Sequence, residues 1–149
     1  MTDLRRATPA DVAALERVAA AAYTPYLPRM AGQRPGPLDA DYAAAVATTE
    51  AWVALDAGEV VGFLLLVAED DAVLLDNVAV HPSHHGRGIG RALLSHAEDR
   101  AHALDLPRLR LYTHVSMVEN QRLYERIGYV ETHRATDHGL TRVFYEKRL

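Results

Sequence analysis

Short apolar runs divide much of the chain into segments typical of β-strands. Three of them, at 51–55, 60–68 and 72–80, are separated by the polar turns DAGE and EDD. This spacing predicts three consecutive strands that form a meander. Further strands are predicted at 2–7, 108–113, 129–134 and 142–149, and the turn DHG joins the last two as a hairpin.

Apolar residues at helical spacing mark the other regular segments. The stretch from Gly88 to Leu104 carries an apolar residue every three or four positions, which predicts a helix with one face packed on a sheet. An earlier helix is predicted over 8–23, where Thr8 and Asp11 have the spacing of a capping box. A second, short helix is predicted over 38–48.

The last predicted helix covers 119–128. Ser116 and Glu119 have the spacing of another capping box, and Gly128 stands where a helix commonly ends. The predicted order is therefore β-α-α-β-β-β-α-β-α-β-β, which defines an α/β fold with a mixed (α+β) sheet. No repeat and no interior linker interrupts this order, so we expect a single domain over 1–149.

Composition narrows the classes of function. The 149 residues include no cysteine, which excludes disulfides, thiolate metal ligands and a covalent cysteine intermediate. A formal charge of −4 and a single lysine, Lys147, argue against a nucleic-acid partner. No segment approaches the ~20 apolar residues of a membrane span, and the N-terminus lacks the apolar core of a signal peptide. We therefore expect a cytoplasmic protein without a membrane partner.

The stretch NVAVHPSHHGRGIGRALL at 77–94 contains three alternate glycines, Gly86, Gly88 and Gly90. Their N–H groups can converge on an anion, and the start of the following helix adds a partial positive charge. This pattern is typical of phosphate binding, although a tight turn that merely eases packing is the alternative. The dinucleotide pattern GxGxxG fails because Arg91 stands at its third glycine, and the lysine of a Walker A loop is absent.

The same stretch resembles the acyl-coenzyme A (acyl-CoA) binding segment of the GNAT superfamily of N-acetyltransferases, usually V-x-P-x-x-(Arg/Gln)-x-x-G-x-(Gly/Ala). The positions in register are Val80, Pro82, Gly88 and Gly90. His85 departs from the pattern, because Arg or Gln is usual there. Further along, ENQRLYERIGY is similar to the second motif of the superfamily, with matches at Asn120, Tyr124 and Gly128. Together with the order of elements, the resemblance covers essentially the whole chain.

This resemblance implies a GNAT-type fold, acetyl-CoA as cofactor, and an acyltransferase that transfers groups other than aminoacyl groups. The strand before the loop is expected to pair with the pantetheine arm through the backbone of Val78, Ala79 and Val80. The pyrophosphate is expected at the loop residues His85, Gly86, Arg87, Gly88, Ile89, Gly90 and Arg91. Asn120 and Tyr124 share a helical face, so one can bind the cofactor arm while the other approaches the sulfur.

Direct transfer needs an unprotonated amine and an acid for the leaving thiolate. In the superfamily the tyrosine matching Tyr124 is often that acid, and packing on the sheet is the alternative role. Asp76 lies inside an apolar strand, on the face of Val78 and Val80 if the alternation is regular, where burial would raise its pKa toward that of a base. A carboxylate satisfied by backbone donors at a strand bend is an equal alternative. His114 is another candidate base.

The acceptor is expected at the loop 24–37 and the helices beside it, because these segments usually set substrate choice in the superfamily. The candidate substrate-binding residues are Tyr23, Tyr26, Arg29, Met30, Arg34, Tyr42 and His114. Arg29 or Arg34 could meet a carboxylate of the acceptor, whereas a surface loop that covers the core is the alternative. These residues do not choose among a small amine, an amino acid, an aminoglycoside and a peptide.

The expected partner is a small-molecule or peptide amine, and assembly into a homodimer stays open. No metal is expected, since His81, His84 and His85 lie in a turn without a further ligand cluster. No serine stands in a G-x-S-x-G elbow, so one-step transfer is favoured over an acyl-enzyme. Two other hypotheses keep the glycine loop: a non-catalytic acyl-CoA sensor, and a binder of another phosphorylated ligand.

Overall fold

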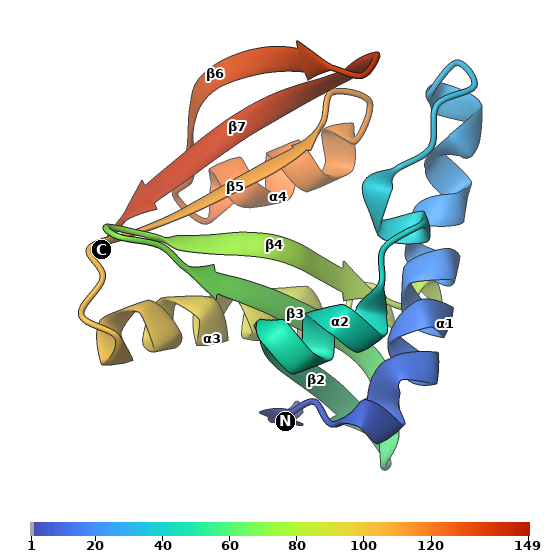
Figure 1. The fold of residues 1–149 in the computed structure, drawn as a ribbon, viewed down its shortest axis with the longest axis vertical. Helices are drawn as coiled ribbons and strands as arrows, with labels where there is room; N and C mark the ends of the chain where they lie inside the picture. Colours follow the sequence, from blue (N-terminus) through green and yellow to red (C-terminus); the bar gives the residue numbers. More distant parts are fainter. Residues whose placement is uncertain (1) are drawn as a thin grey trace.

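A computed structural model describes residues 2–149 as a mixed sheet with helices on both faces (Figure 1). The sheet has seven strands in the order β1-β2-β3-β4-β5-β7-β6. The strands are β1 (Asp3–Arg6), β2 (Glu50–Asp56), β3 (Glu59–Ala68), β4 (Val73–Val80), β5 (Arg108–His114), β6 (Val130–Asp137) and β7 (Leu140–Arg148). The α-helices of this part of the chain are α1 (Val12–Tyr23), α2 (Tyr42–Thr48), α3 (Ile89–Ala103) and α4 (Val118–Arg126).

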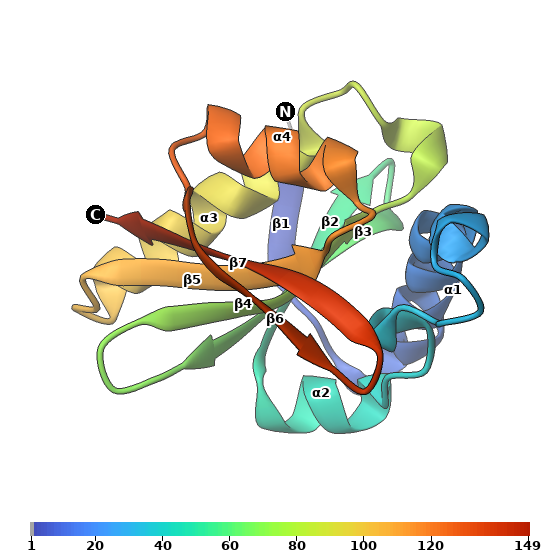
Figure 2. The same ribbon diagram turned by 90° about the horizontal axis from the view of Figure 1, so that it is seen from above.

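Helices α1 and α2 lie on one face of the sheet and α3 and α4 on the other (Figure 2), and an apolar cluster packs between the sheet and each pair of helices. The cluster on the side of α3 and α4 includes Leu93, Leu109 and Tyr145, all fully buried. The cluster on the side of α1 and α2 includes Leu15 and Phe63. The mixed α/β fold predicted from the sequence is therefore confirmed, and the apolar stripe of the predicted third helix packs on the sheet as expected.

The centre of the sheet contains its one parallel strand pair, β4 with β5. The two strands are matched only over Val73–Leu75 and Leu109–Leu111. Beyond these residues they diverge toward α1 (Figure 1). Within residues 2–149, the second half of β4, 77–80, therefore has no strand partner on its β5 side.

The register between β3 and β4 shifts at Asp76. Leu65 pairs with Asn77, while the next residue, Leu66, pairs with Leu75, so Asp76 is an extra residue in a β-bulge. Leu75 consequently packs in the cluster beneath α3, whereas the side chain of Asn77 bonds a residue of α1. The prediction that side chains alternate regularly along this strand is therefore wrong. The bulge changes the face of the sheet on which each side chain after Asp76 lies.

Most predicted segments correspond to observed elements, with differences at their ends. The second helix is shorter than its predicted range 38–48, since it begins at Tyr42. The proline-rich loop 24–37 contains two 3₁₀ turns, Thr24–Arg29 and Gly36–Leu38, where irregular structure was expected. None of the helices within residues 2–149 combines the length and the apolarity needed to cross a membrane.

The capping box predicted at Ser116 and Glu119 does not form. Helix α4 has Met117 as its N-cap, without a hydrogen bond from a capping side chain. Ser116 instead lies at the end of β5, where its hydroxyl is 2.7 Å from Nδ1 of His114. Glu119 accepts a hydrogen bond from Arg29 at 2.9 Å. Ser116 thus has a local partner two residues before it and Glu119 has a distant one, and these contacts replace the cap.

Candidate active site

The loop between β4 and α3 presents a row of free backbone N–H groups. Gly86 and Gly88 have φ of 78° and 79°, a left-handed conformation that glycine adopts without strain. Within residues 2–149, the N–H groups of residues 86–91 meet no acceptor, and the first helical amide that does is Ala92, bonded to the Gly88 carbonyl at 3.0 Å. Free amides at the start of a 15-residue helix form a site for an anion.

The side chains of this loop divide between two surfaces. His85 points back toward β4, where its Nε2 lies 3.2 Å from the Val80 carbonyl oxygen, and Arg91 lies near it on α3. Arg87 points away, and its guanidinium lies 3.5 Å from Asp56. No group of three or more His, Asp or Glu side chains within residues 2–149 is arranged to hold a metal ion.

Two hollows meet beside β4. The first, which we call the long groove, has a volume of about 750 Å³ and runs along the loop and α3. Of the sequence-predicted cofactor residues, it is lined by Val78, Ala79, Val80, His85, Gly86, Gly88, Ile89, Gly90, Arg91, Asn120 and Tyr124. The second, the inner pocket, has a volume of about 400 Å³ and opens between β4 and β5. The residues that line both hollows are Tyr23, Val78, Asn120 and Tyr124.

Tyr124 stands at this junction. Its side chain is only 7% exposed and packs against Tyr129 and Tyr145, with ring centroids 5.8 and 6.1 Å away. Burial raises the pKa of the Tyr124 phenol above its ordinary value, so the hydroxyl stays protonated at neutral pH. No group within residues 2–149 accepts a hydrogen bond from it. The hydroxyl is therefore free to donate its proton to a bound molecule.

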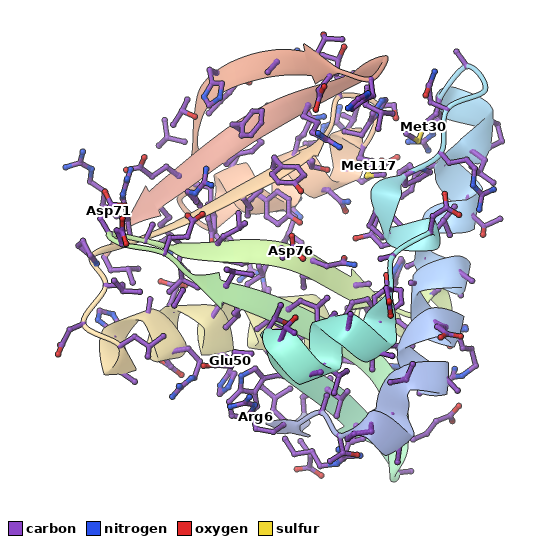
Figure 3. The ribbon with its side chains drawn as sticks, in the orientation of Figure 1. Arg6, Met30, Glu50, Asp71, Asp76 and Met117 are labelled. Atoms are coloured by element: carbon purple, nitrogen blue, oxygen red, sulfur yellow. The ribbon has the colours of Figure 1, made fainter. Side chains whose placement is uncertain are left out.

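Asp76 lies at the bulge of β4 and lines the inner pocket (Figure 3). Asp76 is exposed to solvent, but the protein that surrounds its carboxyl group removes part of its hydration and so raises its pKa, because a less polar environment disfavours the charged form. No cation and no hydrogen-bond donor within residues 2–149 contacts this carboxylate. The alternative interpretation is a carboxylate held by backbone donors at a strand bend. The bend is present, but no backbone N–H within residues 2–149 donates to this carboxylate. Asp76 is thus placed to accept a proton from a molecule in the pocket.

The residue after Asp76 organises the side of the pocket nearest α1. Asn77 is buried, and its Oδ1 accepts a hydrogen bond from the Tyr23 hydroxyl at 2.8 Å. Its Nδ2 donates to the Tyr42 hydroxyl at 3.1 Å, which in turn donates to the Pro37 carbonyl at 2.7 Å. Sequence reasoning missed Asn77, although an amide inside an apolar strand is a signal of this kind of network.

The two arginines expected to meet an acceptor carboxylate are already paired within the protein. Arg29 lies 2.9 Å from Glu119 and above the ring of Tyr26, at 5.2 Å from its centroid. Arg34 lies 3.0 Å from Asp39. Arg29 and Tyr26 line the long groove, not the inner pocket, so the structure places them nearer the glycine loop than expected.

The inner pocket has contributors that sequence reasoning did not identify. Met30 and His114, both expected, line it together with Met117 and Arg142. Figure 3 shows Met30 and Met117 at the end of the sheet where β4 and β5 have separated. Arg142 lies directly across from His114 on β7. The register of β5 with β7 places Arg142 opposite His114, and no local sequence pattern indicates that register.

The family model of the acetyltransferase (GNAT) family matches residues 15–129 of the chain. This range includes the loop, the long groove and helix α4, and therefore most of the residues that form the two hollows.

Solved structures have the same fold at low sequence identity. The PaiA N-acetyltransferase of Thermoplasma acidophilum, solved with coenzyme A, is 17% identical with a TM-score of 0.85, covering 100% of this chain and 99% of its own. The ribosomal-protein-S18-alanine N-acetyltransferase of Escherichia coli is 20% identical with a TM-score of 0.79, covering 99% and 94%. A GNAT family acetyltransferase of Elizabethkingia anophelis with acetyl-CoA bound is 17% identical with a TM-score of 0.71, covering 99% and 98%. These similarities establish a common architecture.

Proposed function

The chain belongs to the GNAT family of acetyltransferases, and from that premise we propose that it transfers an acetyl group from acetyl-CoA directly to a primary amine. One observation carries the proposal. The long groove, with free amides at its loop, joins the inner pocket at Tyr124, and Asp76 lines the same pocket. An anion-binding groove that ends at an acid and a base is the arrangement that acyl transfer from a phosphorylated donor needs.

The chemistry of the long groove suits coenzyme A. The free N–H groups of 86–91 offer convergent donors for a pyrophosphate. Arg91 adds a positive charge to the groove, whereas Arg87 is turned toward Asp56. The unpaired edge of β4 at 77–80 offers backbone groups to an extended chain of amides such as pantetheine.

The inner pocket supplies the acid and the base for the reaction. Acetyl-CoA supplies the acetyl group as a thioester, whose C–S bond breaks as the C–N bond to the amine forms. Asp76, with its raised pKa, takes the proton that the attacking ammonium group must lose. Tyr124, which has no hydrogen-bond acceptor of its own within residues 2–149, donates its proton to the leaving sulfur.

The adjoining hollows favour a one-step reaction with both substrates bound. Tyr23, Val78, Asn120 and Tyr124 line both hollows, so an amine in the pocket and a thioester in the groove would meet there without a carrier. The chain has no cysteine to carry the acetyl group. The reacting atoms are therefore expected to gain their orientation from simultaneous binding.

The test is an acceptor screen with the intact protein and acetyl-CoA. We expect release of free thiol together with an acetylated amine identified by mass spectrometry, and a thermal shift with acetyl-CoA alone. Binding of acetyl-CoA without turnover of any amine class would instead support the acyl-CoA sensor. Absence of both binding and turnover would contradict the use of acetyl-CoA and favour the hypothesis that the glycine loop binds another phosphorylated ligand.

A further inference from the structure

The wall of the inner pocket formed by β5 and β7 carries two nitrogen donors side by side. His114 and Arg142 are directly opposite each other in the antiparallel β5–β7 pair, and both line the pocket. Side chains directly opposite in such a pair lie on the same face of the sheet, close enough to bind one ligand together. Asp76 lies on the other wall, on β4.

The hydrogen bonds of His114 fix which of its ring nitrogens can donate. The backbone N–H of Ser116 donates to His114 Nδ1 at 3.1 Å, so Nδ1 carries the lone pair and the ring proton is on Nε2. Burial, with the nearby charge of Arg142 as a second cause, lowers the pKa of His114. The ring is therefore a neutral donor, and its Nε2–H has no acceptor within residues 2–149.

Arg142 differs from the other arginines near the site. Arg29 and Arg34 have carboxylate partners at 2.9 and 3.0 Å. The nearest carboxylate oxygen to Arg142, on Asp137, is 4.0 Å away, beyond hydrogen-bond range. The guanidinium lies 5.1 Å from the ring centroid of Tyr112, which also lines the pocket. A cation held over a ring with its donors unused is suited to a planar anion such as a carboxylate.

The distance between the two walls sets the length of the molecule. Leu75, beside Asp76, pairs with Leu111, and His114 lies three residues further along β5. Because the strands are parallel and Asp76 is one residue beyond Leu75, the donors lie two residues from its level, which at about 3.3 Å per residue is on the order of 7 Å along the strand. The lining of the pocket also includes the apolar side chains of Met30 and Met117.

We infer that the acceptor is an extended amine with a carboxylate at its other end, of the size of a dipeptide or an ω-amino acid. Its carboxylate binds Arg142 and the Nε2–H of His114, and its amine lies at Asp76 near Tyr124. The other acidic residue of the pocket, Asp41, caps α2 by accepting the Ala44 N–H at 3.0 Å. This inference rests on the proposed function, because it names the substrate class for the same pocket.

Matched acceptors test the inference. With acetyl-CoA saturating, ε-aminocaproate should have a KM lower by roughly 10- to 100-fold than ε-aminocaproamide, since one hydrogen-bonded charge separates them. Arg142→Gln should remove this preference by raising KM for the carboxylate alone, and Arg142→Lys should restore only part of it. Arg134→Gln is the control, because Arg134 is an exposed arginine of β6 that pairs with Glu131 and lines neither hollow. Equal KM values for the two acceptors, or a preference that survives in Arg142→Gln, would overturn the inference.

A binding measurement keeps this test separate from that of the reaction. N-acetyl-ε-aminocaproate and its amide are titrated calorimetrically into the protein with coenzyme A present. Tighter binding of the carboxylate that depends on Arg142, without turnover of any amine, would contradict the proposed function and support the anion site. If the protein acetylates other amines but binds the two compounds equally, the anion site would be contradicted and the proposed function supported.

Discussion

Two tyrosine hydroxyls lie at the junction of the hollows, and their hydrogen bonds separate their roles. The single proton of the Tyr23 hydroxyl is shared between Asn77 Oδ1 at 2.8 Å and the Val78 carbonyl at 3.1 Å. Burial and the neighbouring Tyr124 hydroxyl both raise the pKa of Tyr23. Of the two hydroxyls, that of Tyr124 is the one without an acceptor within residues 2–149. At the level of single residues, these hydrogen bonds favour Tyr124 over Tyr23 as the proposed acid.

Replacing each phenol by phenylalanine should separate catalysis from stability. Tyr124→Phe should lower kcat by roughly 10²- to 10⁴-fold, the usual contribution of a general acid, with the affinity for acetyl-CoA close to that of the wild type. Tyr23→Phe leaves Asn77 Oδ1 without its donor and should cost about 1–3 kcal/mol of unfolding free energy. Steady-state kinetics and denaturant unfolding of both variants measure these effects. Unchanged turnover in Tyr124→Phe would remove it as the acid.

Asp76→Asn should lower activity while it increases stability. A base must be deprotonated, so the rate of the wild type should rise with pH through the raised pKa of Asp76, and this rise should be absent in the variant. A carboxyl whose pKa is raised on folding stabilises the protein only at low pH, and that stability is lost as pH rises through the folded-state pKa. At neutral pH the variant should therefore melt at a higher temperature. A lower Tm, with an unaltered pH–rate profile, would contradict the assignment.

At the scale of elements, two local irregularities create the site. The bulge of β4 and its separation from β5 leave a strand edge free, and the left-handed glycines at the start of α3 leave its first amides free. A regular parallel pair would have closed the first opening, and a loop without φ-positive residues would have turned the amides elsewhere. The irregularities stand beside each other because one loop joins these two elements.

A pair of glycines can distinguish backbone strain from ligand binding. Gly88 and Gly58 have nearly equal φ, 79° and 81°, and neither would bring an added Cβ within 4 Å of another atom. Alanine at either position should cost about 1–2 kcal/mol of stability, because L-residues disfavour this conformation. Only Gly88→Ala should also weaken the binding of acetyl-CoA, because Gly88 lines the long groove whereas Gly58 lies in the β2–β3 turn. Equal affinities in the two variants, measured by calorimetry, would exclude the loop as the phosphate site.

At the scale of the whole molecule, the site lies where the two halves of the sheet separate. Helices α1 and α2 cover one face and α3 and α4 the other, and both apolar clusters extend to β3 and β4 (Figure 2). The hollows between α1, α3 and α4 thus rest on well-packed strands. A ligand in the long groove would contact elements from both faces and hold them together.

Acetyl-CoA should therefore stabilise the whole fold. A ligand that binds only the folded state at 100 times its Kd adds about 2.7 kcal/mol, which raises Tm by roughly 5–10 °C for a chain of this size. Hydrogen exchange should slow most at residues 77–80 and 86–91, whose amides are expected to bind the cofactor, and not in the exposed strand β6. Scanning calorimetry and exchange measurements check both effects. Protection confined to other segments would contradict the proposed binding mode.

The helices and strands, their order and the glycine-rich loop that we propose as the phosphate site follow from local sequence patterns. Helix periodicity, strand runs and the alternate glycines are local properties, because they depend on residues a few positions apart. The resemblance at 77–94 and in the segment ENQRLYERIGY pointed to the family that the family model confirms. The resemblance of ENQRLYERIGY to the second motif predicts the role of Tyr124, the position of Asp76 within an apolar strand predicts that of Asp76, and both roles stay predictions.

The construction of the two hollows depends instead on contacts between distant segments. The bulge at Asp76 depends on the pairing with β3, and the Asn77 network joins residues 35 and 54 positions apart. The pairing of Arg29 with Glu119 joins segments 90 positions apart, and the His114–Arg142 pair depends on the register of β5 with β7. Contacts of this kind arise from the packing of the entire chain, and a local pattern of side chains carries no information about which distant partner completes them.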